Sequence, residues 1–339
     1  MNIQKAIKAV IAKQDLTESE MHAVMSDIMT GQTTDAQIGG FLVGLAMKGE
    51  TIAEITASAK VMRSLAKGVE VKNTKHLVDT CGTGGDGLSL FNISTACAFV
   101  VAAAGGSVAK HGNRSISSKS GSADVLEAAG VNLDMSAEQI SHSVNKIGVG
   151  FMFAPAHHSA MKHAIGPRKE LAVRTIFNVL GPLTNPAKAP TQVMGVYSKE
   201  LVEPIANVLK SLGSKHVMVV HSKDGLDEIS VADDTFVAEL KNGVVTTYTI
   251  NPTDFGIPLG SLDDIKANDA EDSLALIQQA LDGKEGSAKN IIALNAGAAI
   301  YVCGLGTSLQ DGIDKAFNIL NKGSAHQKLD DFVRESTGC

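Results

Sequence analysis

The residues best suited to chemistry begin with a run of glycines, Gly82-Thr83-Gly84-Gly85-Asp86-Gly87. The run follows a short apolar segment, 76–79, and precedes a helix predicted to start near Asn92. Glycines let backbone N–H groups approach phosphate oxygens, and the N-terminus of a helix attracts an anion. The run therefore predicts a phosphate-binding turn, and a turn with only a structural role is the alternative.

Two common nucleotide-binding motifs do not explain this run. Gly82, Gly84 and Gly87 match the GxGxxG spacing of a dinucleotide-binding turn, but no Asp or Glu stands between 87 and 123 to bind a ribose hydroxyl. The chain also contains no GxxxxGK[ST] sequence. We therefore expect neither a dinucleotide site nor the P-loop of a nucleoside triphosphatase.

A second cluster, residues 110–122, is rich in groups that bind anions. It directly follows a predicted strand, 107–109, and combines the cations Lys110, Arg114 and Lys119 with five serines and no acidic residue. Guanidinium, ammonium and hydroxyl donors at the end of a strand suit a polyphosphate or a sugar phosphate. The alternative interpretation is a solvated basic loop.

A third candidate is the acidic pair Asp227-Glu228, shortly after the strand predicted at 217–220. Carboxylates at the end of a parallel strand can hold Mg²⁺, which prefers one or two carboxylates, waters and substrate phosphates. Surface charge is the alternative for this pair. His157, His158 and His163 lack the spacing of an HExxH zinc site and are predicted to line a pocket or a helix surface.

The elements that position these residues are predicted from length and composition to be those of a two-domain α/β protein. The chain has 339 residues, 33 of them glycine, and is 44% hydrophobic but only 4% aromatic. Its net charge of −6 argues against a surface that grips nucleic acid or anionic lipid. The longest apolar run, 96–104, is too short to cross a bilayer, and the four cysteines form no CxxC pair. A cytoplasmic protein with reduced thiols is expected.

Hydrophobic periodicity divides the chain into two parts. Residues 1 to about 68 read as helices only, with helix starts at Thr17, Thr34 and Thr51. Beyond them, short β-branched runs alternate with helices, which is typical of a mostly parallel sheet flanked by helices. The predicted strands are 76–79, 107–109, 149–153, 192–197 and 217–220, with a hairpin at 236–240 and 244–250 on the edge; helices are predicted at 170–180, 272–281, 288–303 and 308–320.

Several motifs, in order along nearly the whole chain, resemble those of the anthranilate phosphoribosyltransferase family. They are Gly39-Gly40-Phe41-Leu42, Asp79-Thr80-Cys81-Gly82-Thr83-Gly84-Gly85-Asp86, Asn92-Ile93-Ser94-Thr95, Lys110-His111-Gly112-Asn113-Arg114, Ser117-Ser118, Ser122-Ala123-Asp124, Arg174-Thr175-Ile176-Phe177-Asn178 and Gly181-Pro182-Leu183-Thr184-Asn185-Pro186. The resemblance implies transfer of a phosphoribosyl group from phosphoribosyl pyrophosphate to anthranilate in tryptophan biosynthesis. It also implies Mg²⁺, a homodimer formed through the helical domain, and no nucleic acid or membrane partner. The helical domain would span 1–70 with a middle segment of about 168–188, and the α/β domain would span 76–165 and 190–339.

The same resemblance assigns roles to individual positions. Residues implied to bind phosphoribosyl pyrophosphate are Gly82, Gly85, Asp86, Asn92, Ile93, Ser94, Thr95, Lys110, His111, Gly112, Asn113, Arg114, Ser115, Ser117, Ser118 and Ser122. Those implied to bind anthranilate are Gly82, His111, Asn113, Pro155 and Arg168, and those implied to hold magnesium are Ser94, Asp227 and Glu228. Lys110 and Arg114 would stabilise the leaving pyrophosphate, and His111 would either accept the departing proton or only line the pocket.

Two positions depart from the family pattern, and two other functions compete with the implied one. Leu90 stands where the family often has Thr, which removes a hydrogen bond, and Ser159 where it usually has Pro, which loosens a wall of the anthranilate channel. A pyrimidine nucleoside phosphorylase would use a similar glycine turn for a single phosphate without the acidic pair. A non-enzymatic, nucleic-acid-binding relative would need a basic surface, which the net charge does not favour.

Overall fold

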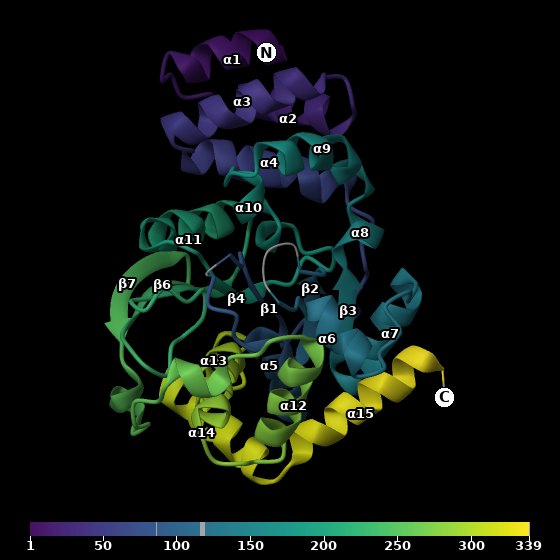
Figure 1. The fold of residues 1–339 in the computed structure, drawn as a ribbon, viewed down its shortest axis with the longest axis vertical. Coiled ribbons are helices and arrows are strands. Elements are labelled where there is room, and N and C mark those ends of the chain that lie inside the picture. The colour runs from purple at the N-terminus through teal and green to yellow at the C-terminus, as the bar shows by residue number, and fades with distance from the viewer. Residues whose placement is uncertain (86, 116–118, 339) are drawn as a thin grey trace.

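Four helices near the N-terminus form the top of the molecule in Figure 1, where α9 (Lys162–Leu171) and α11 (Val202–Ser211) pack against them. The computed structural model describes residues 1–85, 87–115 and 119–338. The helices are α1 (Ile3–Ile11), α2 (Glu18–Met29), α3 (Asp35–Lys48) and α4 (Ile52–Leu65). Thr17, Thr34 and Thr51 each cap a helix in a reciprocal capping box, so the three helix starts predicted there are confirmed.

A seven-stranded sheet forms the larger part of the molecule. Its strands are β1 (Leu77–Gly82), β2 (Ser107–Gly112), β3 (Val149–Phe153), β4 (Thr191–Gly195), β5 (His216–Ser222), β6 (Thr235–Lys241) and β7 (Val244–Ile250), in the order β3-β2-β1-β4-β5-β6-β7. The first five are parallel, and β6 and β7 are antiparallel. The predicted edge hairpin is confirmed, and Asn242 and Gly243 make its tight turn with φ of 52° and 77°.

Helices cover both faces of the sheet because successive side chains of each buried strand point to opposite faces. Val193 and Met218 belong to the apolar cluster that contains α5, whereas Met194 and Val217 belong to the cluster that contains α11 and the N-terminal helices. The remaining helices are α5 (Ile93–Ala103), α6 (Ser122–Ala128), α7 (Ala137–Ile147), α8 (Ala154–His157), α9 (Lys162–Leu171), α10 (Phe177–Leu180), α11 (Val202–Ser211), α12 (Ala270–Leu281), α13 (Ser287–Val302), α14 (Leu309–Asn321) and α15 (Ser324–Thr337). Short 3₁₀ turns are η1 (Ser159–Met161), η2 (Pro182–Thr184), η3 (Lys199–Leu201), η4 (Pro252–Phe255) and η5 (Leu262–Ile265).

The helix predicted at 170–180 is wrong. The chain instead leaves α9 at Ala172, whose φ of 49° lies in the left-handed region, and re-enters a helix only at Phe177. The Asn178 side chain accepts the backbone N–H of Thr175 at 2.9 Å and so fixes the start of this short second helix. The interruption produces an exposed segment, 172–174, between α9 and α10.

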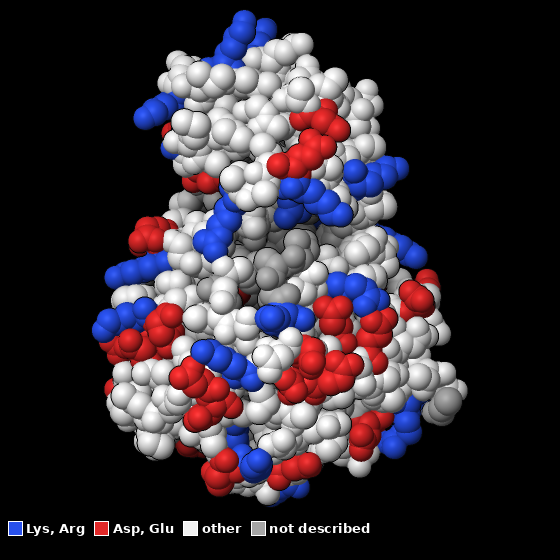
Figure 2. All heavy atoms as spheres, viewed as in Figure 1, with Lys and Arg blue, Asp and Glu red and all other residues white. Residues whose placement is uncertain are grey.

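The strand order places a ligand site at the carboxyl ends of the strands next to β1. The chain runs from β1 to β2 and β3 on one side, then returns to β4 on the other, so the order reverses at β1. Open α/β sheets bind ligands at such a point. Figure 2 shows a hollow between the helical part and the sheet part, with Lys and Arg side chains on its upper rim. No helix in the described ranges has the length and apolar character needed to span a membrane.

Candidate active site

Two glycines at the ends of neighbouring strands make room for Asp227. Gly82 of β1 and Gly195 of β4 are register partners. A Cβ on Gly82 would lie 2.3 Å from Asp227 Oδ2, and one on Gly195 would lie 1.5 Å from the Asp227 carbonyl oxygen. The Gly84 N–H donates to Asp227 Oδ2 at 2.6 Å. The glycine turn after β1 is therefore hydrogen-bonded to Asp227, the first residue of the predicted acidic pair. Asp227 lies in the loop that follows β5.

The N-terminus of α5 meets this turn without a side-chain cap. Asn92 is the N-cap residue, but its side chain makes no capping hydrogen bond. Its Oδ1 instead accepts the hydroxyls of Ser120, at 2.9 Å, and Ser273, at 2.7 Å. Asn92 thus joins α5 to the loop after β2 and to α12. An N-terminus without a side-chain cap offers the N–H groups of its first turn to an anion.

Lys110 lies beneath α5 and is only 3% exposed. Its Nζ donates to the Thr80 carbonyl oxygen and, at 3.1 Å, to Ser94 Oγ. In this arrangement its direct partner is the predicted magnesium ligand Ser94. A phosphate contact of Lys110 itself stays a prediction, as does that of Thr95, whose side chain is 2% exposed and faces the interior beside Lys110.

A buried carboxylate, Asp79 in the middle of β1, hydrogen-bonds to the neighbouring strand β2. It is 1% exposed, its Oδ2 accepts the Asn185 side-chain amide at 2.7 Å, and its Oδ1 accepts the His111 N–H at 3.4 Å. Burial raises the pKa of this carboxyl group, and the charge of Lys110 opposes that rise. Asp79 therefore connects β2 to the segment that precedes β4.

The loop that follows β2 is closed by Asp124 on α6. Its Oδ2 accepts the N–H groups of Ser115, at 2.9 Å, and Gly121, at 2.8 Å, across the loop. Arg114 is half-exposed and pairs with Glu127, with its guanidinium carbon 5.6 Å from the Phe153 ring centroid. The predicted site residues Asp86, Ser117 and Ser118 lie outside the described residues. Gly85, Ile93, Gly112, Asn113 and Ser122 are on the glycine turn, at the start of α5, on β2, on the following loop and on α6, in that order.

Two histidine rings pack against each other at a tilt beside the end of β2. The ring centroids of His111 and His158 lie 5.0 Å apart, and in the described part of the chain neither buried Nε2 has a hydrogen-bond partner. Burial lowers the pKa of His111 to about 3 and that of His158 to about 4, and each histidine's pKa is lowered further by the proximity of other basic groups. Both rings are neutral at pH 7. A neutral imidazole nitrogen without a partner can accept or donate a hydrogen bond to a bound ligand.

The two remaining residues of the predicted anthranilate site come from the region between β3 and α10. Pro155 is exposed at the second position of α8. Arg168 lies in the last turn of α9, where its guanidinium carbon is 5.3 Å from the Phe177 ring centroid and burial lowers its pKa. Both residues lie on helices, outside the loops that contain the glycine turn and Asp227.

The residues predicted to hold a metal, Ser94, Asp227 and Glu228, all offer oxygen atoms. Asp227 is 9% exposed, and the charge of the half-buried Glu228 reaches Cys97 on α5, whose pKa is raised first by burial and then by that charge. Within the described ranges no group of three or more His, Cys, Asp or Glu side chains forms a metal cage. Two carboxylates and the hydroxyl of Ser94 fit Mg²⁺, which takes its other ligands from water and phosphate.

Sequence reasoning missed four residues that hold this site together: Asp79, Asp124, Arg174 and Ser273. The first three stand inside the motifs that resemble the family, with Asp79 in the middle of β1 and Asp124 in the first turn of α6. Their position in those motifs was an available signal. Ser273 carries no such signal, since it lies in a helical stretch 181 residues away from Asn92 along the chain.

A turn at the switch point, an uncapped helix N-terminus and paired carboxylates together define an enzyme that handles a phosphorylated substrate. Comparison with known proteins narrows this class. Two domains of a glycosyl transferase family match the chain, the helical bundle domain over residues 4–66 and the a/b domain over residues 74–326.

Individual relatives are close in sequence and in structure. The chain is 79% identical to an anthranilate phosphoribosyltransferase of Ruthia magnifica subsp. Calyptogena magnifica, over 100% of both chains. The crystal structure of that enzyme from Thermus thermophilus matches with a TM-score of 0.92 at 40% identity, over 98% of this chain and 99% of the other. A Saccharomyces cerevisiae enzyme of the same name, in complex with PRPP and Mg, shares the fold at 24% identity with a TM-score of 0.89, over 99% and 98% of the two chains. The chain therefore belongs to the anthranilate phosphoribosyltransferases of the glycosyl transferase family.

Proposed function

We propose that this enzyme transfers the 5-phosphoribosyl group of phosphoribosyl pyrophosphate to anthranilate, giving N-(5-phosphoribosyl)anthranilate and pyrophosphate, in tryptophan biosynthesis. The observation that carries the proposal is the hydrogen bond between the glycine turn and Asp227, next to the N-terminus of α5, which has no side-chain cap. It brings backbone N–H donors and a carboxylate for a cation to one place, as a pyrophosphate with its metal requires. The identity to the Ruthia magnifica enzyme over the full chain supports the choice of substrates.

In this proposal, phosphoribosyl pyrophosphate lies between the glycine turn, α5 and the loop after β2. Asn92 and Asp124 hold α5 and the loop after β2 through the hydrogen bonds described above, and Asp227 holds the glycine turn. Arg114 exchanges Glu127 for phosphate oxygens when substrate binds, since a guanidinium binds phosphate with two parallel hydrogen bonds. Lys110 donates to Ser94 Oγ and so holds the hydroxyl that would bind the metal.

Asp227, Glu228 and Ser94 would hold Mg²⁺. When bound, this ion supplies positive charge to the pyrophosphate as the bond from ribose C1 to oxygen breaks. The chain itself supplies the N–H groups of the glycine turn and the cation Arg114 to the same developing charge. No covalent nucleophile is required, because positioning and electrostatic stabilisation suffice for this displacement.

Anthranilate would bind between His111 and Arg168. The attacking aniline nitrogen is already neutral at pH 7, so a strong base is not needed. A neutral His111 suits this role, because its pKa of about 3 keeps it uncharged and able to accept a hydrogen bond from the amine. Arg168 would pair with the anthranilate carboxylate through its planar fork.

We also propose a homodimer formed through the helical domain, and a cytoplasmic location. Ile11 on α1 and Met47 on α3 are 69% and 79% exposed, and their helices pack on one another. Such exposed apolar side chains favour burial against a second copy. The proposed helical domain is 1–70 with 168–188, supported by the packing of α10 and η2 against α4 and of α9 against α3.

One assay tests the substrates and the reaction together. Purified protein is mixed with phosphoribosyl pyrophosphate, Mg²⁺ and anthranilate, and the loss of anthranilate fluorescence is followed. We expect a loss that requires all three additions. No loss with anthranilate, together with phosphorolysis of thymidine in the absence of Mg²⁺, would contradict the proposal and favour a nucleoside phosphorylase.

A further inference from the structure

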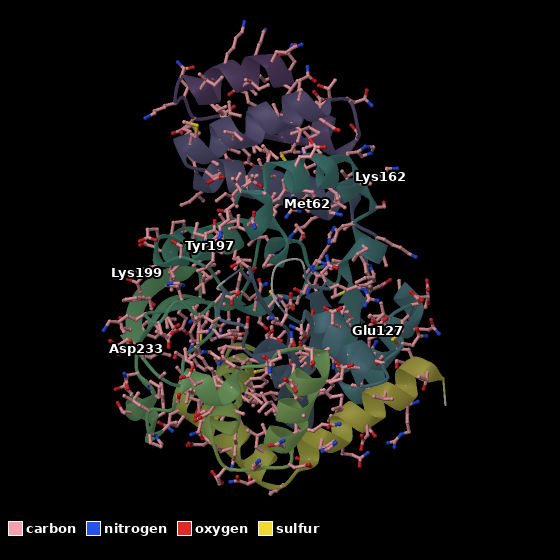
Figure 3. The ribbon with its side chains drawn as sticks, viewed as in Figure 1. Met62, Glu127, Lys162, Tyr197, Lys199 and Asp233 are labelled. Atoms are coloured by element: carbon pink, nitrogen blue, oxygen red, sulfur yellow. The ribbon has the colours of Figure 1, made fainter. Side chains whose placement is uncertain are left out.

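Three distant parts of the chain meet next to the glycine turn. Arg174, in the segment between α9 and α10, donates from Nη2 to the carbonyl oxygen of Gly85 at 2.5 Å. Its guanidinium carbon also lies 4.3 Å from the ring centroid of Tyr197, just beyond β4. Figure 3 labels Tyr197 on the side of the molecule that carries β4, across from Glu127 of α6. A single arginine therefore links the segment between two helices, the glycine turn and the end of a central strand.

The backbone that carries Arg174 is held on both sides. Before it, the N–H of Ala172 donates to the Arg168 carbonyl oxygen, which ends α9. After it, Thr175 and Phe177 are buried, and the Thr175 N–H is bound by Asn178. Arg174 itself is exposed. Because the residues on both sides of Arg174 are held in place, the backbone from which its guanidinium extends to the glycine turn is fixed.

Tyr197 supplies a suitable surface for this guanidinium. Burial and then the charge of Glu50 raise the pKa of the phenol, while Arg174 opposes that rise. The phenol is therefore neutral, and the face of a neutral aromatic ring attracts a cation. The planar guanidinium can stack on the ring and still donate in its own plane to Gly85, which an ammonium group cannot do.

The glycine turn needs this support. Gly84 and Gly85 have φ of 65° and 80°, and glycine loses more conformational freedom on ordering than any other residue. The turn is fastened on one side by the bond from Gly84 to Asp227 and on the other by the bond from Arg174 to Gly85. If either hydrogen bond is lost, the glycine turn is less ordered before substrate binds. Part of the binding free energy is then used to order the turn, and the affinity falls.

We propose that Arg174 is a positioning residue for phosphoribosyl pyrophosphate. Stacked on Tyr197, it holds the Gly85 carbonyl and thereby sets the orientation in which the glycine turn presents its N–H groups to the pyrophosphate. This inference rests on the proposed function, since it names the substrate of that same site. It assigns a role in binding to the segment between α9 and α10, which contributes no residue to the predicted phosphate loops.

The test compares the two substrates in steady-state kinetics. Arg174→Ala is expected to raise KM for phosphoribosyl pyrophosphate about tenfold, the effect of losing one partly solvated hydrogen bond to a charged group. KM for anthranilate and kcat are expected to change less than twofold. Arg174→Lys recovers part of the loss because it keeps the charge but not the stack. Tyr197→Leu raises the same KM, and Tyr197→Phe restores most of the affinity because it keeps the ring.

Lys169→Ala is the matched control, since it removes an exposed cation from the last turn of α9 and is expected to leave both KM values unchanged. Thermal unfolding of every variant shows that it is folded, and calorimetric titration with phosphoribosyl pyrophosphate and Mg²⁺ measures binding without turnover. If Arg174→Ala binds this substrate as tightly as the native protein, or if both KM values rise equally, the assigned role is wrong. A native protein that binds phosphoribosyl pyrophosphate but does not consume anthranilate would contradict the proposed function alone.

Discussion

A single methyl group at Gly82 should disable the site while leaving the fold largely intact. The added Cβ would lie 2.3 Å from Asp227 Oδ2, and real Cβ atoms do not come closer than 3.0 Å, so the carboxylate must move by about 0.7 Å. That shift disturbs the 2.6 Å bond from Gly84, a hydrogen bond to a charged group worth about 1.5–3 kcal/mol. Misplacing a group in a site by about 1 Å costs on the order of 100-fold in rate.

The assay is the fluorescence assay described above, run across a series of Mg²⁺ concentrations. Gly82→Ala is expected to lose about 100-fold in rate and to require more Mg²⁺ for half of its maximal rate. Gly39→Ala is the control, because no atom lies within 4 Å of the added methyl group and alanine favours the helix α3 by about 0.5–1 kcal/mol. Wild-type rate and Mg²⁺ dependence in Gly82→Ala would refute the reasoning.

Gly195→Ala sharpens the comparison. Its Cβ would lie 1.5 Å from a backbone oxygen, which cannot rotate away as a side chain can, so this variant should lose stability as well as activity. Overpacking of a core costs about 1–3 kcal/mol, and a loss at the upper end lowers Tm by several degrees in a chain of this size. Equal Tm values for Gly82→Ala and Gly195→Ala would contradict this expectation. They would show that the backbone around Asp227 can move to accommodate the methyl group without loss of stability.

Three further outcomes are expected. Asp227→Ala combined with Glu228→Ala should cost about 3–4 kcal/mol of transition-state stabilisation, or 10²–10³ in rate, with Tm nearly unchanged, and Mg²⁺-dependent activity equal to that of the native protein would contradict this. Arg168→Ala should raise KM for anthranilate roughly 10- to 150-fold while calorimetry shows unchanged binding of phosphoribosyl pyrophosphate, with partial recovery in Arg168→Lys. In the folded protein the pKa values of His111 and His158 are about 3 and about 4, below the ordinary 6.5. As pH falls from about 7 to 4, the unfolded chain therefore binds more protons than the folded chain, and the free energy of unfolding must decrease. Urea unfolding at pH 7 and pH 5 should show that loss, and His158→Asn should reduce it.

Much of the fold could be predicted because its local signals agree with its packing. The capping threonines, the apolar strands and the Asn242-Gly243 turn each specify their element within a few residues. The helix α15 was not predicted, since its sequence is mostly polar and only a narrow stripe, including Leu329 and Phe332, is buried. The continuous helix at 170–180 failed because nothing local in the sequence marks Ala172 for the left-handed conformation.

The candidate site was predictable as a set of residue types and less so as a set of contacts. The glycine turn and Asp227, which the sequence places after two separate strands, are joined by a hydrogen bond. Their actual contact depends on the pairing of β1 with β4, strands more than a hundred residues apart. The buried position of Lys110 and the pairing of Arg114 with Glu127 depend likewise on tertiary packing, which no local pattern of cations reveals.

Because β1 lies in the middle of the sheet, its two edges find their partner strands at different times while the ribosome synthesises the chain. β2 can join one edge of β1 soon after it emerges, and β3 can then join β2, but the other edge of β1 pairs only with β4, which starts at Thr191. At about 5–20 residues per second, the N–H and C=O groups of that edge wait roughly 5 to 20 seconds for their partners. An open edge of this kind can pair with other chains. Slow translation between 83 and 190 should therefore lower the yield of folded enzyme, whereas pauses after β5 should matter less.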